Sequence, residues 1–383
     1  MSWLKSKMSY KFGKLAINKS ELCLANVLQA GQSFRWIWDE KLNQYSTTMK
    51  IGQQEKYSVV ILRQDEENEI LEFVAVGDCG NQDALKTHLM KYFRLDVSLK
   101  HLFDNVWIPS DKAFAKLSPQ GIRILAQEPW ETLISFICSS NNNISRITRM
   151  CNSLCSNFGN LITTIDGVAY HSFPTSEELT SRATEAKLRE LGFGYRAKYI
   201  IETARKLVND KAEANITSDT TYLQSICKDA QYEDVREHLM SYNGVGPKVA
   251  DCVCLMGLHM DGIVPVDVHV SRIAKRDYQI SANKNHLKEL RTKYNALPIS
   301  RKKINLELDH IRLMLFKKWG SYAGWAQGVL FSKEIGGTSG STTTGTIKKR
   351  KWDMIKETEA IVTKQMKLKV ELSDLHIKEA KID

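Results

Sequence analysis

The leading candidate for a catalytic residue in this sequence is a lysine at the start of an expected helix. In the stretch SYNGVGPKVADCVCLMG (241–257), Lys248 follows a Gly-Val-Gly turn and a proline that suits the first helical position. The N-terminal end of a helix carries partial positive charge and therefore disfavours an ammonium group. A lysine kept neutral near physiological pH is a nucleophile that can form Schiff bases. Cys252, four residues later, shares the helix face of Lys248.

A carboxylate is the second candidate, nineteen residues after the lysine. Asp267 lies in VPVDVHVSRIAKR (264–276), directly before a short helical pattern, where an N-cap is the more economical interpretation. Beside a nucleophilic lysine, the same carboxylate could orient the amine and stabilise a cationic, sugar-like transition state. Capping and catalysis are compatible, because a cap fixes the direction of the carboxylate. His269 suits a phosphate contact near this helix start, with a purely structural histidine as the alternative.

The glycine turn before Lys248 is a candidate binding site for a phosphate backbone. The patterns over 231–242 and 247–257 predict two helices joined by a tight hairpin. Glycines allow positive φ and leave backbone amides uncovered, and uncovered amides at a helix start bind phosphate oxygens. Gly244, Val245 and Gly246 would then contact a nucleic-acid backbone. The alternative is an ordinary corner between two helices, closed by a glycine cap.

The residue pattern changes from strand-like to helical along the chain. Together the two parts predict an α+β fold that positions these candidate residues. Residues 9–115 contain short β-branched runs without helix-length crossovers, which predicts an N-terminal antiparallel β-rich domain. In this part, the alternation of Phe34, Trp36 and Trp38 predicts a strand over 32–38. Residues 116–335 show helical periodicity and predict an all-helical catalytic bundle with short connections.

Two terminal segments and a set of helices complete this prediction. Residues 1–8 read as a disordered N-terminal extension, and 336–383, with GGTSGSTTTGT and KKRK, as a flexible basic tail. The expected helices begin at Pro129 and, after a break at 139–143, at Ile144, and continue near 176–191, 195–209, 217–228, 231–242, 247–257, 268–276, 284–295 and 305–320.

The composition indicates which kind of molecule this protein binds and in which kind of cellular compartment it works. The formal charge of +10 favours a polyanion, nucleic acid before membrane, although a merely basic protein would show the same bias. Eight scattered cysteines, several in apolar stretches, indicate buried thiols in a reducing compartment. Their spacing matches neither a zinc site nor an iron–sulfur cluster, and no apolar run reaches the length of a membrane span.

Five motifs in order carry a resemblance to a known family. One is Gly-Val-Gly-Pro-Lys with Val-Pro-Val-Asp-Val-His following at this spacing, and the other four are GQSFRW (31–36), FICSSNNNISRI (136–147), LGFGYRAKY (191–199) and GWAQGVLFS (324–332). Over about residues 10–335 the chain resembles the helix-hairpin-helix DNA glycosylases, and among them the eukaryotic 8-oxoguanine DNA glycosylases with AP lyase activity. The resemblance implies an enzyme of base excision repair that kinks duplex DNA and flips an oxidised guanine, opposite cytosine, into a pocket. Ring-opened purines are expected as further substrates.

The resemblance also implies a role for each matching residue in the pocket. Lys248 would attack C1′ of the deoxyribose to form a Schiff base that leads to β-elimination, and Asp267 would stabilise the positive charge. The backbone carbonyl of Gly31 would accept the N7–H that distinguishes 8-oxoguanine from guanine. Phe331 and Cys252 would sandwich the base, and Gln327 would bind its Watson–Crick edge.

Further residues are implied to bind the DNA around the lesion. Asn141 would fill the space left by the flipped base, Arg146 and Arg196 would read the orphaned cytosine, and Tyr195 would wedge beside it. The hairpin is a candidate cation site through the backbone carbonyls of Met240, Tyr242 and Val245. No redox cofactor is expected, and no iron–sulfur cluster, because no cysteine follows Cys254.

The resemblance leaves some alternatives open. Pro247 departs from the family pattern, where a non-proline residue is usual, but a proline costs no helical hydrogen bond there. The implied protein is a monomer in the nucleus, with the mitochondrion as the alternative compartment. The competing functions are a helix-hairpin-helix glycosylase for another damaged purine, such as a ring-opened one, and a non-catalytic damage-binding module.

Overall fold

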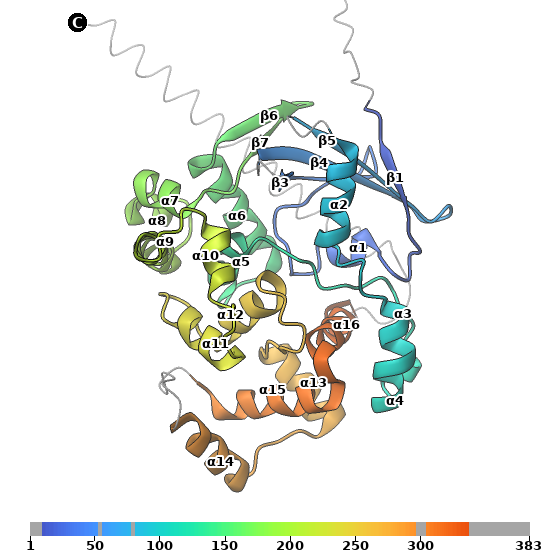
Figure 1. Ribbon diagram of the computed structural model, residues 1–383, viewed down its shortest axis with the longest axis vertical. Helices are drawn as coiled ribbons and strands as arrows, with labels where there is room; N and C mark the ends of the chain where they lie inside the picture. Colours follow the sequence, from blue (N-terminus) through green and yellow to red (C-terminus); the bar gives the residue numbers. More distant parts are fainter. Residues whose placement is uncertain (1–9, 53–55, 78–80, 296–303, 337–383) are drawn as a thin grey trace, which may run out of the picture. The chain divides into compact units, whose positions relative to one another are not determined.

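The computed structural model describes residues 10–52, 56–77, 81–295 and 304–336 (Figure 1). The described residues up to Lys333 belong to one compact unit. The interpretations of 1–8 as an extension and of most of 336–383 as a tail concern residues outside the described ranges. In the described part of the chain, no helix has the length and apolar character needed to cross a membrane.

The N-terminal part contains a five-stranded antiparallel sheet, as the sequence predicts. Its strands are β1 (Gly13–Ala16), β2 (Ile37–Asp39), β3 (Gln44–Ile51), β4 (Lys56–Asp65) and β5 (Ile70–Val76), in the order β1-β5-β4-β3-β2. Helix α2 (Gln82–Tyr92) lies against the sheet (Figure 1), where Leu85 and Leu89 join the sheet's core cluster. Strands β2 to β5 pair in sequence order and form a meander, whereas β1 pairs with β5, so the chain passes from one edge of the sheet to the other between β1 and β2.

The strand expected over 32–38 is wrong for most of its length, since β2 begins only at Ile37. The aromatic alternation has another cause. Phe34 packs into the large helical core, whereas Trp36 packs into the core under the sheet and donates to Tyr92 Oη at 3.0 Å. The segment thus connects two cores without pairing as a strand, and this places Gly31 and Gln32 beside the pocket described below.

Residues 9–115 are less strand-rich than expected, because helices follow the sheet. Besides α1 (Leu24–Val27) and α2, a nearly continuous helical segment comprises α3 (Leu99–His101), the π-helix η1 (Leu102–Trp107) and α4 (Ile108–Ser110), followed by the 3-10 turn η2 (Phe114–Lys116). Leu102, Phe103 and Trp107 belong to the core of the helical part. The boundary between 115 and 116 stays a prediction, and packing is continuous across it.

The C-terminal part is mostly helical, as expected, but it is not all-helical. A two-stranded hairpin of β6 (Leu161–Ile165) and β7 (Val168–His171) interrupts it. Asp166 and Gly167 both have positive φ, 49° and 84°, as a two-residue hairpin turn requires. The Asp-Gly pair between Ile165 and Val168 was therefore the sequence signal for this hairpin. The helix expected over 176–191 is divided in two, because Thr184 caps a new helix start.

Some helices of this part contribute residues to the candidate site. The helices are α5 (Pro129–Ser139), α6 (Ile144–Phe158), α7 (Ser176–Arg182), α8 (Glu185–Glu190), α9 (Arg196–Glu213), α10 (Asp219–Ser225), α11 (Tyr232–Met240), α12 (Pro247–Cys252), the π-helix η3 (Val253–Gly257), α13 (Val268–Tyr278), α14 (Lys284–Asn295), α15 (Leu306–Trp319), the 3-10 turn η5 (Gly320–Tyr322) and α16 (Ala323–Gly336). The contributing ones are α5, α12, η3 and α16. The helix expected over 247–257 is one helical run that widens to a π-helix after Cys252. Gly257 lets this run approach α5 closely, since a Cβ there would lie 3.1 Å from Pro129 Cα.

A buried ionic network ties α11, α12 and α15 together. Arg236 lies 3.0 Å from Asp251 and 2.7 Å from Asp309, and Arg312 lies 3.0 Å from Asp309. The hydroxyl of Tyr232 donates to Asp251 at 2.6 Å. Burial acts to raise the pKa of Asp309, but Arg312 and Arg236 hold that pKa below its ordinary value. The network fixes α12, and therefore the start of the helix that carries Lys248.

Candidate active site

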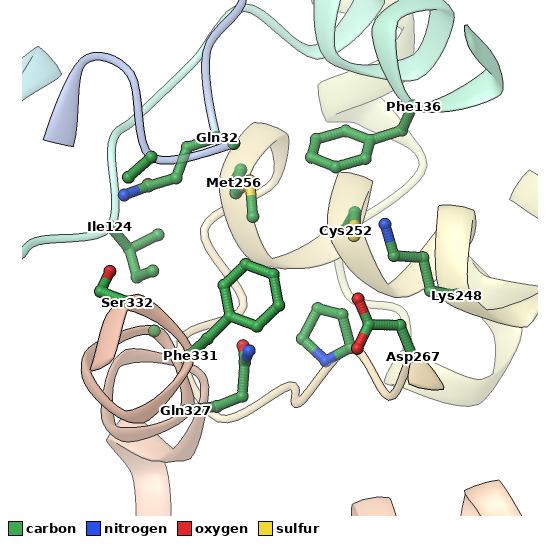
Figure 2. A pocket seen from close by; sticks show the side chains of 14 residues that line it. Gln32, Ile124, Phe136, Lys248, Cys252, Met256, Asp267, Gln327, Phe331 and Ser332 are labelled. Atoms are coloured by element: carbon green, nitrogen blue, oxygen red, sulfur yellow. The ribbon is translucent and has the colours of Figure 1, made fainter. Parts of the chain in front are cut away.

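One pocket gathers six residues that the sequence analysis selected from distant parts of the chain. Gly31, Lys248, Cys252, Asp267, Gln327 and Phe331 all line it. Figure 2 shows the Lys248 amine on one side of this pocket, between Phe136 and the Asp267 carboxylate, with Phe331 and Gln327 on the wall formed by α16. The predicted nucleophile, carboxylate and base-contacting side chains therefore share one cavity.

Lys248 enters the pocket from the first turn of α12, as the sequence predicts. The side chain is half-buried, and Nζ lies 4.8 Å from the ring centroid of Phe136 on α5. A ring face attracts a cation by about 0.5–2 kcal/mol. A helix start disfavours a cation by about 0.3–1 kcal/mol. These two influences oppose each other, so the neutral amine inferred from the helix start alone stays a prediction.

Cys252 lies beside the lysine, one turn further along α12. Its side chain is 2% exposed. Burial raises the pKa of the thiol to about 11, although the neighbouring Lys248 acts in the opposite direction. The thiol is therefore protonated at neutral pH and serves the pocket as a small apolar wall, in keeping with contact to a flat ring.

Asp267 caps α13 and faces the pocket at the same time. One oxygen, Oδ1, accepts the amide hydrogens of His269 at 2.9 Å and of Val270 at 3.0 Å. Since both capping bonds go to Oδ1, the second oxygen is not needed for the cap. The cap therefore leaves the second oxygen of this fixed carboxylate for the charge stabilisation predicted from the sequence, which stays a prediction.

The opposite wall comes from α16. Phe331 lines the pocket and meets the ring of His269 edge-on, with centroids 5.9 Å apart and an interplanar angle of 81°. Gln327 lies one helical turn before Phe331 and lines the same pocket. The arrangement offers an aromatic face and an amide to a planar polar ligand, while His269 packs on the aromatic residue.

Gly31 has a conformation that favours glycine. Its φ is +80°, and a Cβ at this position would lie 3.2 Å from Ile144 Cδ1. The next residue anchors the segment: the buried amide of Gln32 donates to the Arg123 carbonyl at 2.7 Å and accepts from the Leu125 amide at 3.1 Å. The backbone next to the pocket is therefore held from two directions.

Several pocket residues were missed by sequence reasoning. The remaining lining residues are Ala30, Gln32, Ile124, Phe136, Met256, Pro265, Gly328 and Ser332. Phe136 belongs to the strongly apolar helix α5 and reads as an ordinary core residue, so nothing in its local pattern marked it. Met256 lies one helical turn after Cys252, and this spacing could have predicted that both residues line the same pocket.

The four residues expected beside the orphaned base surround one turn between α5 and α6. Asn141 is exposed there with φ of 49°. The hydroxyl of Tyr195 donates to the Ser140 carbonyl at 3.1 Å, and Arg196 donates to the carbonyls of Ser140 and Asn141, the latter at 3.1 Å. Arg146 donates to the Gly192 carbonyl at 3.2 Å.

The exposures of these four residues differ in a way that matters for DNA contact. Tyr195 is 46% exposed, whereas Arg196 is 3% exposed and stacks on the Tyr195 ring at 4.6 Å. Arg196 therefore supports the turn from within. Its reading of cytosine stays a prediction, and it would require the guanidinium to share or release these carbonyls.

The glycine hairpin has the geometry that the sequence predicts. Gly244 has φ of +78°, and a Cβ there would lie 2.7 Å from the Tyr199 ring, so glycine is required. Gly246 is the N-cap of α12 in extended conformation, with open space where a Cβ would point. Val245 between them is buried. The first glycine thus makes the turn, and the second leaves the amides at the helix start uncovered.

The expected cation site at this hairpin involves backbone carbonyls only. The Tyr242 carbonyl already accepts the Val245 amide at 3.2 Å, which leaves one lone pair for a cation. Among the described residues, no group of three or more His, Cys, Asp or Glu side chains is placed to hold a metal ion. The participation of Met240, Tyr242 and Val245 stays a prediction.

Comparison with known proteins connects both parts of the chain to one family. Residues 14–133 match the model described as 8-oxoguanine DNA glycosylase, N-terminal domain, and residues 134–296 match that of the HhH-GPD superfamily base excision DNA repair protein. The N-glycosylase/DNA lyase OGG1 of Arabidopsis thaliana is 33% identical over 328 residues, which cover 85% of this chain and 80% of the plant protein.

Solved structures agree with this similarity. MBOgg1 in complex with a low-affinity DNA ligand superposes with a TM-score of 0.64 at 26% identity, covering 86% of this chain and all of that chain. The 8-oxoguanine glycosylase/lyase of Clostridium acetobutylicum, in complex with double-stranded DNA containing cytosine opposite 8-oxoguanine, superposes with a TM-score of 0.61 at 26% identity. That match covers 86% of this chain and 99% of the bacterial one.

Proposed function

We propose that this chain, which belongs to the 8-oxoguanine DNA glycosylase family, excises 8-oxoguanine opposite cytosine from duplex DNA and then cleaves the strand as an AP lyase in base excision repair. The observation that carries the proposal is the pocket in which Lys248 and Asp267 face Phe331, Gln327 and Gly31. A nucleophilic amine, a fixed carboxylate and a slot for a planar base are the groups that this chemistry needs.

Base recognition would use the walls of the pocket. A purine between Phe331 and Cys252 would meet an aromatic face on one side and an uncharged thiol on the other. Gln327 would pair with its Watson–Crick edge, and the Gly31 carbonyl would accept the N7–H of 8-oxoguanine. Guanine has a lone pair at N7, so the same carbonyl would repel it.

The chemical steps would follow from the positions of Lys248 and Asp267. The lone pair of the neutral amine forms the N–C1′ bond, while the C1′–N9 bond breaks and the base leaves with that electron pair and takes up a proton. Transfer of the amine proton to O4′ opens the sugar to an iminium ion. Loss of a C2′ proton then expels the 3′ phosphate. The Asp267 carboxylate stabilises the cationic sugar in the first step and the iminium afterwards.

Contact with DNA would extend from the pocket to the surrounding backbone. The amides uncovered at Gly246 suit a phosphate, and a cation on the carbonyls of Met240, Tyr242 and Val245 would strengthen that contact. The exposed Asn141 and Tyr195 suit the space left by a flipped base. The proposed partner is double-stranded DNA, bound by a monomer, and the proposed compartment is the nucleus, with the mitochondrion as the alternative.

Borohydride trapping on a duplex with 8-oxoguanine opposite cytosine tests the proposal. We expect a covalent protein–DNA adduct with the natural chain and none with Lys248→Gln, because an amide cannot form the iminium that borohydride reduces. Lys275→Gln, on the exposed surface of α13, is the matched control and should trap normally. An undiminished adduct with Lys248→Gln, or none with the natural chain, would contradict the catalytic assignment and favour a damage-binding module.

The lesion is tested separately. Excision rates on duplexes that carry 8-oxoguanine, a ring-opened purine or an alkylated purine should be highest for 8-oxoguanine, with activity on ring-opened purines as well. A clear preference for the alkylated base would replace the proposed substrate by the alternative one and leave the lysine chemistry intact.

A further inference from the structure

We propose that Phe136 is a positioning residue for Lys248: its ring face holds the amine at the pocket wall through a cation–π contact and aims it as the nucleophile. This inference rests on the proposed function and deepens it, because it assigns to a residue of α5 the control of the attacking amine. Phe136 was not selected from the sequence, because a phenyl ring takes no part in the chemical steps.

The geometry of the pair is direct. The Nζ of Lys248 lies 4.8 Å from the centroid of the Phe136 ring, within the range of a cation–π contact. Both residues line the same pocket, and Figure 2 shows the lysine amine reaching toward the ring from α12. A ring at this distance restricts the rotamers of a long side chain, so it also aims the amine.

The ring itself cannot move away easily. Phe136 is 2% exposed, and the ring of Phe34 packs against it edge-on, with centroids 5.8 Å apart at an angle of 77°. The helix that carries it, α5, packs against η3 directly after α12, and Gly257 allows this close approach to Pro129. Lysine and ring are therefore held by two elements in fixed contact, and the amine moves against a rigid surface.

Besides the ring, titratable groups stand around Lys248, and the Asp267 carboxylate faces the same amine (Figure 2). Because Asp267 is unchanged in every Phe136 variant proposed below, differences between these variants report the ring. Cys252 on α12 carries a thiol with a pKa of about 11, so it is uncharged. Asp267 and His269 stand at the start of α13, with the histidine against Phe331 and one Asp267 oxygen engaged in the cap. Asp251 on α12 and Arg236 on α11 pair with each other, and Glu131 on α5 pairs with Arg35.

A measurable consequence follows from the sign of the contact. The ring stabilises the cation and has little attraction for the neutral amine. Because loss of the proton must precede attack, we expect the strength of the contact to show in the acid limb of the pH–rate profile. Weakening the ring's attraction should move that limb to lower pH by roughly 0.5–1.5 pH units.

Graded fluorination of Phe136 tests this with little change in shape. Phe136 is replaced by 4-fluoro-, 3,5-difluoro- and 3,4,5-trifluorophenylalanine, which progressively weaken the negative ring face. Single-turnover formation of the borohydride-trapped adduct is then followed from acid to alkaline pH. We expect the acid limb to move to lower pH stepwise with fluorine number. Phe136→Leu should move the limb as far as trifluorination or further, and it should also lower the plateau rate as the amine loses its guide.

A control variant and two different negative results separate this inference from the proposed function. Phe158→Leu removes a buried aromatic ring of the same core on α6 and should leave the limb unchanged. A natural chain that traps DNA but whose limb does not respond to fluorination or to Phe136→Leu overturns this inference alone. A natural chain that traps nothing at any pH overturns the proposed function, and this inference falls with it.

Discussion

Helix α12 carries two charged residues, one turn apart, that the protein treats in opposite ways. Asp251 is 2% exposed, lies 3.0 Å from Arg236 and receives the hydroxyl of Tyr232 at 2.6 Å. Lys248 is half-buried, faces a cavity, and has an uncharged ring 4.8 Å from its amine. One charge is neutralised inside a closed network, and the other is left available.

The difference separates stability from reactivity. A charge that is fully paired in the interior cannot act on a ligand, and breaking its pair is costly. A charge held by a weak, non-directional contact can lose its proton and move. The ionic network at Asp251 fixes the helix from behind, so that the reactive end can remain loosely held without losing its position. The predictions below test each half of this contrast.

The largest effect is expected from the paired side. Asp309→Asn leaves the guanidinium groups of Arg236 and Arg312 short of one negative partner, and we expect the free energy of unfolding to fall by about 3–5 kcal/mol at neutral pH. Urea denaturation measures this change. Glycosylase activity of the folded fraction should fall much less than stability, because Arg236 still pairs with Asp251 on α12 and no pocket residue is altered.

The pH dependence of this loss has a definite sign. The pKa of Asp309 in the folded protein lies below the ordinary value of 3.8, despite burial, because Arg312 and Arg236 stabilise the carboxylate. Its contribution is therefore complete above the ordinary value and is lost as pH falls through the lowered one. The stability gap between the natural chain and Asp309→Asn should narrow in acid. Asp104→Asn, at an exposed pair with Lys100, should show almost no gap at any pH.

The next effect tests the reactive side. Asp267→Asn keeps an N-cap for α13 but removes the charge, and we expect roughly a 10²-fold slower single-turnover excision with unchanged thermal stability. Asp267→Ala, which loses cap and charge together, should be as slow and also less stable. If Asp267→Asn excises the base at the natural rate and only Asp267→Ala is slow, Asp267 acts through the cap. Its predicted role in charge stabilisation would then be wrong.

Local patterns predicted the outline of the fold and part of the candidate site. Lys248, Gly244 and Asp267 were found because each stands at a helix start or tight turn, where residue type and backbone conformation are strongly linked. The antiparallel sheet followed from short runs of β-branched residues. In contrast, the strand expected over 32–38 failed because Phe34 and Trp36 alternate between two cores, and a pattern of period two does not record which core is filled.

Long-range contacts explain the rest. Nothing near Phe136 shows that its ring lies under an amine more than a hundred positions later, and nothing near Arg196 shows that it binds the carbonyls at 140 and 141. Gln327 and Phe331 were assigned by resemblance, since an amide and an aromatic residue on an apolar helix have no distinctive pattern of their own. These positions become evident only when α5, α12 and α16 are packed.

The smallest effect is expected for Gln327, whose uncharged amide is proposed to recognise the damaged base. Gln327 lines the pocket from α16 and offers an amide to a base edge. Because hydrogen bonds to one edge contribute about 0.5–1.5 kcal/mol net each, Gln327→Ala should weaken binding to a duplex with 8-oxoguanine by about 10-fold. Binding to undamaged duplex should not change, since that affinity comes from backbone contacts. Gln224→Ala, on the exposed side of α10, is the control. Equal losses on damaged and undamaged DNA would contradict the role of Gln327 in reading the base, and recognition in the pocket would then rest on Gly31 and Phe331.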